Sequence, residues 1–573
     1  MKNSVKKIIA LAGATTFLCG ALAGCGGGPA TGGVTEKIDE SKTQLYVSVF
    51  NGGIGTDWMV EIEKAFEEAN KDICFEPGTD KKGVQIIATP SADNGKKIST
   101  NGLAGYSDEV FFTEIIPYYE WVQKGMIADI SDVVESVAAN GEGTIESKLS
   151  EQQQSKLTAV DGKYYALPHY ETFMGVSYDV DLFENKMLYF SANPENGNNG
   201  FVTSKTETRS MGPDGKTGVE NGVDYSIDDG LPSTYEEFFK LCDYMLVRNV
   251  TPFVWTGSHA TGYTHYLLEA VFNAYSTKTE MLLPLTMDSG DENIRVISDF
   301  DASGNPTIEN VQVNEESGYQ IFQQAGRYYA LNFLEKILSK KDYYYTLSTN
   351  STFSHYNAQE QFIYSSLENK PIAMLIDGTW WTNEADEAFE RSVASYGSRA
   401  ENRRFAWMPL PRKATASDSM GEEYAMKDAL RSYAFINGNV KDANKLKLAK
   451  EFLKFCYSDA ALQEFTVATG VPKGVNYSLT DTQKNGLSYY AQNIWNYKNS
   501  YEVVYSLSDN KIFMNDENAF VADVWTTTVD GTDYLYPYSA FRSTTANVTA
   551  VEYFKGMKVS ANDWASRYSK YYK

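Results

Sequence analysis

Cysteine and histidine are both scarce in this chain, which has five cysteines and four histidines among 573 residues. Two cysteines lie near the N-terminus, and the other three are far apart and form no C-x-x-C pair. A disulfide framework or a zinc cluster is therefore not predicted. Four histidines also argue against a histidine metal centre, so we expect neither a metal nor a cofactor.

Basic residues are outnumbered, because 51 Lys and Arg face 75 Asp and Glu and leave a formal net charge of −24. So acidic a surface repels phosphate backbones, and nucleic acid is not expected as a partner. A group of aspartates between residues 191 and 230 is a candidate calcium site, but its spacing does not match an EF-hand loop, and calcium stays an alternative only. The group consists of Asp214, Asp224, Asp228 and Asp229.

Common catalytic signatures are missing as well. The chain has no H-E-x-x-H and no G-x-S-x-G, and no G-x-G-x-x-G follows a predicted strand. Gly215-Lys216-Thr217 resembles the end of a phosphate-binding loop, but position 210 is Ser210 where that loop needs glycine. These absences favour a protein that is not an enzyme.

The N-terminus has the parts of an export signal. Lys2, Lys6 and Lys7 precede an apolar stretch, residues 8–22, which suits a secretory signal and is short for a membrane span. The stretch ends in Leu22-Ala23-Gly24-Cys25, which resembles the lipobox of bacterial lipoproteins. The resemblance implies that residues 1–24 are removed and that Cys25 carries a lipid on the outer face of the cell membrane. An ordinary signal peptide cut near Ala23 is the alternative.

A glycine-rich segment follows the lipobox. Residues 25–42 include Gly26-Gly27-Gly28 and have no apolar period, which predicts a flexible tether. No later segment has a run of about 18 apolar residues, so nothing else in the chain is expected to span a membrane.

Short apolar runs alternate with an amphipathic segment after the tether. Residues 45–50, 84–88 and 109–112 predict buried strands, and the spacing of apolar residues over 59–69 predicts a helix. This alternation indicates right-handed βαβ units and a parallel sheet. Ligands bind beyond the carboxyl ends of such strands, so residues 51–58 and 113–114 occupy candidate ligand positions.

Five stretches, in this order, are similar to the extracellular solute-binding proteins of bacterial ABC importers, the group that includes maltodextrin-binding proteins. Each stretch is weak alone, but together they cover most of residues 43–475. They are the lipobox ending at Cys25, DGKYYALP at 161–168 with VSYD at 176–179, LPSTYEEF at 231–238, IAMLIDGTW at 372–380, and a late helix pair over 449–472.

The resemblance implies an α/β, two-lobed periplasmic-binding-protein-like fold of type II, with a hinge and a central cleft. Chain crossings are expected near Pro168, Pro371 and Ser432. The expected lobes are 43–168 plus 372–431 and 169–371 plus 432–573. Residues 191–230, residues 280–315 and the tail beyond 476 are extra to smaller family members.

The resemblance also implies a monomer that captures an oligosaccharide and delivers it to the permease subunits of an ABC importer. Sugars have polar edges and apolar faces, so a sugar site needs aromatic rings beside hydrogen-bonding groups. Packing is the alternative for each tryptophan, and helix capping is the alternative for the first aspartate. The candidate ligand-binding residues are Asp57, Trp58, Glu114, Glu171, Trp255, His259, Asp377, Trp380, Trp381 and Arg542, the last with Asp533 and Tyr536 in a weaker late cluster.

Two other functions remain open from the sequence. A peptide or another solute could bind the same scaffold, and an acidic cleft would suit a cationic ligand. An exported glycoside hydrolase would need a pair of carboxylates about 5–10 Å apart, which the many acidic residues do not exclude.

Overall fold

A computed structural model describes residues 37–95, 97–98, 102–138, 141–220, 223–418, 425–428, 432–505, 525–542 and 547–572. The predicted export signal, the lipid site at Cys25 and the tether up to residue 36 lie outside these residues. Within them, no helix is both long enough and apolar enough to cross a membrane.

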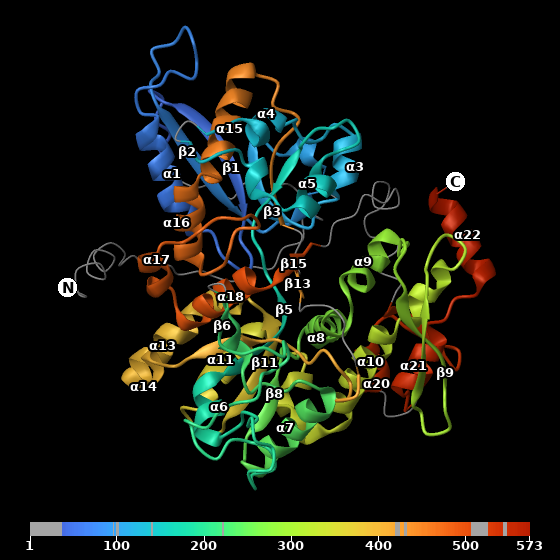
Figure 1. Cartoon of the computed structure of the whole chain (residues 1–573). Coiled ribbons are helices and arrows are strands. Elements are labelled where there is room, and N and C mark those ends of the chain that lie inside the picture. The colour runs from blue at the N-terminus through green and yellow to red at the C-terminus, as the bar shows by residue number, and fades with distance from the viewer. Residues whose placement is uncertain are drawn as a thin grey trace. The chain divides into compact units, whose positions relative to one another are not determined.

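The first sheet has five strands in the order β2-β1-β3-β14-β4 (Figure 1). β1 is parallel to β2 and β3, which confirms the predicted parallel arrangement, whereas β14 is antiparallel to β3 and β4. The strands are β1 (Thr43–Phe50), β2 (Val84–Ser91), β3 (Val110–Glu114), β4 (Ala166–Pro168) and β14 (Ser432–Ile436). Helices that pack on this sheet are α1 (Trp58–Ala69), α3 (Tyr118–Gln123), α4 (Ser131–Glu135), α15 (Ala443–Cys456) and α16 (Asp459–Thr469).

The second sheet has four strands in the order β12-β5-β11-β8. β11 is parallel to β8 and antiparallel to β5, and β5 is also antiparallel to β12. Met374 and Ile376 of β11 pack into one apolar core while Leu375 packs into another. Both faces of the sheet are therefore covered, which explains the continuous apolar run of this strand. The strands are β5 (Met174–Asp179), β8 (Thr251–Val254), β11 (Ile372–Gly378) and β12 (Phe405–Met408).

Helices cover both faces of the second sheet. Thr234 caps α7 by accepting a hydrogen bond from the Glu237 N–H at 3.1 Å, which places the predicted LPSTYEEF helix start at the expected position. The helices around this sheet are α6 (Val180–Lys186), α7 (Tyr235–Val247), α8 (Ala260–Tyr275), α9 (Lys278–Thr286), α10 (Ala325–Ser339), α11 (His355–Ser365), α12 (Trp381–Glu384), α13 (Asp386–Tyr396), α14 (Ser398–Glu401) and α18 (Tyr489–Ser500).

The strand pairing corrects the expected lobe boundaries. Residues 372–431 were expected in the lobe that contains β1, but β11 and β12 lie in the second sheet. Conversely, β14 was expected in the other lobe and lies in the first sheet. No crossing therefore occurs near Pro371. An apolar run predicts a buried strand, but hydrogen bonds to distant strands decide which sheet the strand joins.

The chain passes between the sheets after β4 and before β14, near Pro168 and Ser432 as predicted. The Ser432 hydroxyl donates to the carbonyl of Tyr170 at 2.8 Å and accepts from the N–H of the same residue at 2.9 Å. The N–H of Glu171 donates to the carbonyl of Pro472 at 2.9 Å. A third passage lies between α16 and α18, and α17 (Asp481–Gly486) falls within it.

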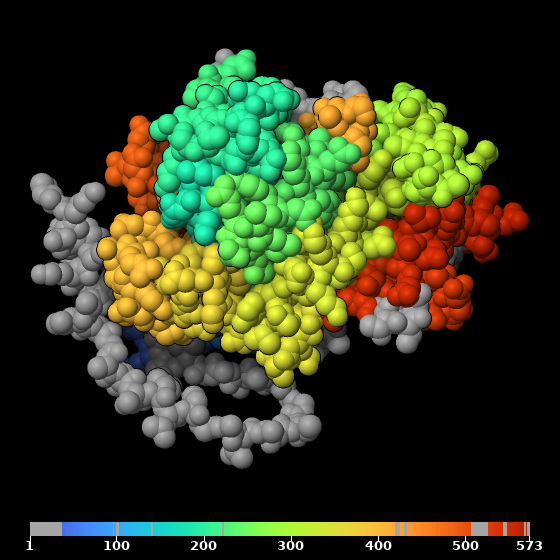
Figure 2. Space-filling view, turned by 90° about the horizontal axis from the view of Figure 1, so that it is seen from below, coloured from blue at the N-terminus to red at the C-terminus, as the bar shows by residue number. Residues whose placement is uncertain are grey.

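Part of the 280–315 segment and the late tail pack against one another. The rings of Phe300 and Phe554 have centroids 5.9 Å apart, and the indole N–H of Trp564 donates to the carbonyl of Glu315 at 2.7 Å. In Figure 2 the red C-terminal residues lie beside the yellow-green residues of this region. The elements are β9 (Ile294–Phe300), β10 (Pro306–Val311), α20 (Pro537–Phe541), α21 (Ala550–Gly556) and α22 (Ala561–Tyr572). The remaining short strands are β6 (Val219–Glu220), β7 (Val223–Asp224), β13 (Ala425–Lys427), β15 (Glu502–Val504), β16 (Thr527–Val529) and β17 (Thr532–Tyr534), and α5 (Glu151–Leu157) completes the helices named here.

Candidate ligand-binding site

Acidic side chains from both sheets gather at strand ends. Glu114 is the last residue of β3, and Asp377 lies one residue before the end of β11. The amide of Gln359 in α11 donates from the same nitrogen to Asp377 Oδ2 at 3.1 Å and to Glu384 Oε2 at 2.8 Å. The charge of Glu384 helps to raise the pKa of Glu114, so the Glu114 carboxyl group lies near the other two. We treat the three carboxyl groups as one cluster.

Aromatic side chains lie beside these carboxylates. The rings of Tyr263 and Tyr266 in α8 have centroids 5.1 Å apart, and Tyr266 meets Trp380 edge to face at 5.9 Å. Trp380 folds back over Gly378, where a Cβ atom would come within 2.0 Å of the indole, so glycine is required there. A Cβ atom on Gly53, in the loop after β1, would lie 3.3 Å from the same ring.

We call these side chains the strand-end site. It combines flat aromatic surfaces with hydrogen-bonding groups, as a sugar site requires. Glu114 comes from β3 of the first sheet, and the other six members come from the second sheet and the helices around it. Its members are Glu114, Tyr263, Tyr266, Gln359, Asp377, Trp380 and Glu384.

Burial strongly favours the neutral form of these carboxyl groups. Burial and the nearby charge of Glu384 raise the pKa of Glu114 to about 8. The same two causes raise the pKa of Asp377 well above its ordinary value, and burial raises the pKa of Glu384 to about 7. Burial and the charges of all three carboxylates raise the pKa of Tyr266 to about 12. Near neutral pH, this site therefore offers carboxyl groups that can donate as well as accept hydrogen bonds.

All four candidate tryptophans are buried in the apolar cores, Trp380 with 6% of its surface exposed. Trp58 is 1% exposed and packs against Phe112 and Phe465, while Trp255 and Trp381 have no exposed surface. Packing accounts for these three positions in this conformation. Trp380 is the one of the four that joins the strand-end site, and it stays a prediction that at most one of the adjacent pair faces ligand.

Glu171, another candidate, is fully buried and held by internal partners. One of its oxygens pairs with the ammonium of Lys498, and the other accepts a hydrogen bond from the Tyr505 hydroxyl. Because these contacts engage both oxygens, the structure places Glu171 as an anchor of the crossing segment.

The remaining polar candidates are exposed. Asp57 precedes α1 but makes no capping hydrogen bond with its side chain. His259 begins α8 one turn before Tyr263, and its Nδ1 lies 2.9 Å from the Ser258 hydroxyl. The rings of His259 and His355 have centroids 6.4 Å apart.

The late cluster of Asp533, Tyr536 and Arg542 is not part of the strand-end site in the residues described. Asp533 accepts a hydrogen bond from the Thr528 hydroxyl at 2.6 Å, and Arg542 lies over the ring of Tyr538. The rings of Tyr536 and of His265, which lies on α8, have centroids 6.1 Å apart.

Sequence reasoning missed four members of the site. Glu384 and Gln359 lie on helices, where a polar residue looks like any solvent-facing position. Tyr263 and Tyr266 are three residues apart on the helix that follows β8, so they share a face. Their place directly after the strand end at Trp255 is the signal that would have found them.

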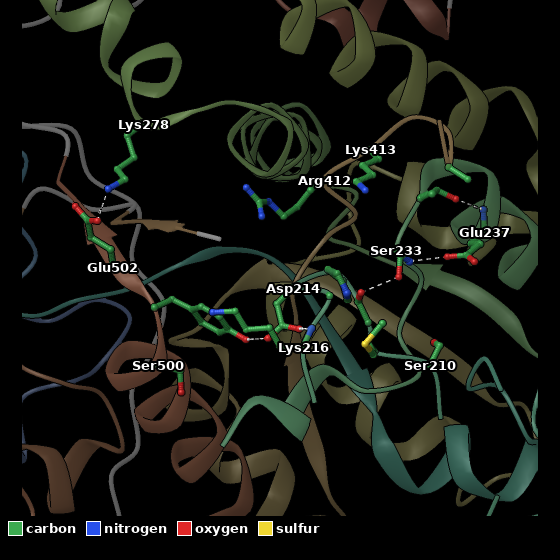
Figure 3. Close-up of a pocket in the computed structure, with 17 residues that line it drawn as sticks. Ser210, Asp214, Lys216, Ser233, Glu237, Lys278, Arg412, Lys413, Ser500 and Glu502 are labelled. Carbon is green, nitrogen blue, oxygen red and sulfur yellow. Dashed lines mark hydrogen bonds and ion pairs between the residues drawn. The ribbon is translucent and has the colours of Figure 1, made fainter. Parts of the chain in front are cut away.

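A separate cavity of about 780 Å³ has mixed charge and contains none of the predicted ligand residues. Figure 3 shows Arg412 and Lys413 beside it and Lys278 paired with Glu502. Asp214 also lines this cavity, and its carboxylate accepts hydrogen bonds from the Tyr501 hydroxyl and the Lys216 N–H.

The four aspartates considered for calcium have protein donors as partners. The backbone N–H of Asp214 donates to Asp228 at 3.1 Å, the Thr217 hydroxyl donates to Asp229 at 2.7 Å, and Ser226 donates to Asp224. In the described part of the chain, no three His, Cys, Asp or Glu residues are grouped to hold a metal ion.

Two α/β units built on separate sheets, joined by crossing segments and with a polar and aromatic site at their strand ends, define a two-lobed solute-binding protein. Residues 53–463 match the bacterial extracellular solute-binding protein family, and the chain belongs to that family. The members of this family are exported binding proteins. No curated protein sequence matches the chain.

Solved structures agree with this fold at low sequence identity. A chitin oligosaccharide binding protein is 14% identical with a TM-score of 0.52, over 92% of this chain and all (100%) of the other. RafE in complex with raffinose is 15% identical with a TM-score of 0.49, over 84% of this chain and 97% of the other. A sugar transporter from Bacillus licheniformis in complex with stachyose is 12% identical with a TM-score of 0.46, over 91% and 100%.

Proposed function

We propose that this protein captures an oligosaccharide at the strand-end site and delivers it, chemically unchanged, to the permease of an ABC importer. The observation that carries the proposal is the meeting of Trp380 and Tyr266 with the carboxyl groups of Glu114, Asp377 and Glu384. Rings can stack on the apolar face of a sugar while carboxyl groups bind its hydroxyls. The similarity in fold to a chitin oligosaccharide binding protein lends support.

Capture follows from the arrangement of the chain. The site takes residues from β3 in the first sheet and β11 in the second, and only a few segments join the sheets. A ligand that contacts both groups stabilises the conformation that brings them together. The role proposed for these carboxyl groups is therefore to bind the ligand in one conformation of the protein, and not to cleave a bond.

A thermal-shift screen of the purified protein against a broad glycan panel tests this function. The panel includes neutral, amino and acidic oligosaccharides, with peptides and other solutes as a separate group. We expect at least one oligosaccharide to raise the melting temperature and to be recovered intact by chromatography. Binding by another solute class and by no glycan would contradict the sugar assignment, and release of shorter sugars would indicate a hydrolase.

We further propose that the protein is a monomer held at the outer face of the cell membrane by a lipid on Cys25, with residues 26–41 as the tether. Tethering keeps the binding lobes near the permease at high effective concentration. We expect Cys25→Ala to release the protein from the membrane fraction and to leave ligand affinity unchanged. Retention of Cys25→Ala in that fraction would contradict the anchor, and loss of affinity would place the anchor in the binding site.

A further inference from the structure

The strand-end site gathers three carboxyl groups without a cationic partner among the residues described. Two other buried carboxylates are each paired with a cation: Glu171 contacts Lys498, and Asp179 contacts Arg403. Glu114 is buried, with 8% of its surface exposed. Its side-chain carboxyl group makes no ion pair and accepts no hydrogen bond from the residues described. Because an isolated buried charge is costly to desolvate, these carboxyl groups stay neutral in the protein alone, and a ligand that supplies a positive charge would favour their ionised form.

A second observation comes from Gln359, which has no exposed surface. Its amide nitrogen is held between Asp377 and Glu384, yet its carbonyl oxygen has no hydrogen-bond partner in the described structure. A buried carbonyl without a donor is uncommon. The carboxyl groups therefore lack a positive charge beside them, and the Gln359 carbonyl lacks a donor.

An ammonium group supplies both of these. It carries three N–H donors and no acceptor, so it can bind carboxylates and a carbonyl oxygen at once. The rings of Tyr266 and Trp380 beside the carboxyl groups also suit a cation, because the face of an aromatic ring attracts positive charge. A neutral hydroxyl supplies one donor and brings no positive charge that would favour ionisation of the carboxyl groups.

We propose that the strand-end site selects a cationic carbohydrate, an oligosaccharide that carries a protonated amine as glucosamine does. This inference rests on the proposed function, because it names the class of oligosaccharide that the site takes. The amine lies among Glu114, Glu384 and Gln359, and a sugar ring lies against Trp380.

Three β-1,4-linked tetramers test the proposal, because they share a backbone and differ at the second carbon of each sugar. They are the glucosamine tetramer, the N-acetylglucosamine tetramer and cellotetraose. Isothermal titration is carried out at about pH 6, below the usual pKa of an amine. We expect the glucosamine tetramer to bind at least about ten-fold more tightly than either neutral tetramer, because hydrogen bonds between charged groups are the stronger ones.

Variants then test which carboxyl groups give the preference for the cationic tetramer. Glu114→Gln and Glu384→Gln keep the shape of the side chain and are each expected to reduce the preference for the glucosamine tetramer about ten-fold. Glu387→Gln, three residues further on and 89% exposed at its side chain, is the matched control and should leave the preference unchanged. An equal loss for Glu387→Gln would mean that overall charge, rather than the site, selects the ligand, and would overturn the proposal.

Each remaining outcome has a distinct meaning. If a neutral oligosaccharide from these tetramers or from the wider glycan panel binds as tightly as its amino counterpart, the cationic preference is wrong and the proposed function stands. If no glycan binds and a cationic peptide does, the proposed function is wrong. If nothing binds in any group, both proposals fail.

Discussion

Buried carboxylates occur in two kinds of surroundings in this protein. Glu171 and Asp179 are each paired with a buried cation, at the crossing segment and at the end of β5. Glu114 and Asp377 lie at strand ends beside another carboxylate, with no ion pair among the residues described. The paired groups hold the fold in place. Burial holds the unpaired groups in their neutral form in the protein alone, and a cationic ligand would favour their ionised form.

The largest expected effect comes from breaking a paired carboxylate. Glu171→Ala leaves Lys498 buried without its partner, which typically costs about 3–5 kcal/mol of the free energy of unfolding. Urea denaturation followed by circular dichroism measures this change. Glu114→Gln is the comparison variant and should cost less than about 1 kcal/mol. A loss for Glu171→Ala as small as that of Glu114→Gln would remove the distinction between the two groups.

The second effect is on pH dependence. The folded pKa of Glu114 is about 8, above its ordinary 4.5, so the stability that this group contributes is present below about pH 4.5 and is lost as the pH rises through about 8. We expect Glu114→Gln to flatten the fall of unfolding free energy in this window, by up to about 1.4 kcal/mol per pH unit. Glu384 faces the same group and titrates in the same window.

Chemical denaturation at several pH values between about 4.5 and 8 measures this slope. Glu387→Gln, which replaces an exposed carboxylate on α13, is the control and should keep the slope of the unaltered protein. An unchanged slope in Glu114→Gln would show that burial does not hold Glu114 in its neutral form.

The smallest effect distinguishes two neighbouring tryptophans. Trp380→Ala should weaken binding of the oligosaccharide found in the panel by about 1–3 kcal/mol, because this side chain lies in the site. Trp381→Phe keeps an aromatic ring in the core and should leave affinity within about 0.5 kcal/mol. Isothermal titration measures both. Equal losses of affinity in the two variants would mean that disturbed core packing, and not a lost contact with the ligand, weakens binding.

Much of the fold could be predicted from local sequence. The apolar runs near residues 45–50, 84–88 and 372–376 are strands, and the LPSTYEEF motif starts a helix as expected. These features depend on periodicity and capping within a few residues. The lobe boundaries could not be predicted in the same way, because β11 and β14 are assigned to sheets by hydrogen bonds to strands more than 70 residues away.

Part of the site could also be predicted from local sequence. Glu114 and Asp377 directly follow apolar runs, so the strand-end rule pointed to them. Trp58 and Trp255 also lie near strand ends, but their orientation depends on tertiary packing, which local sequence does not contain. Glu384 and Gln359 reach the site from helices, and only the folded chain brings their side chains together.

Trp380 touches parts of the chain that belong to different sheets, since its indole lies over Gly378 at the end of β11 and against Gly53 after β1. The emission of an indole depends on what surrounds it. A ligand that changes the spacing of these two turns therefore changes the fluorescence of this residue. The protein carries its own optical reporter of closure, and subtraction of the Trp380→Phe signal would isolate it without an attached dye.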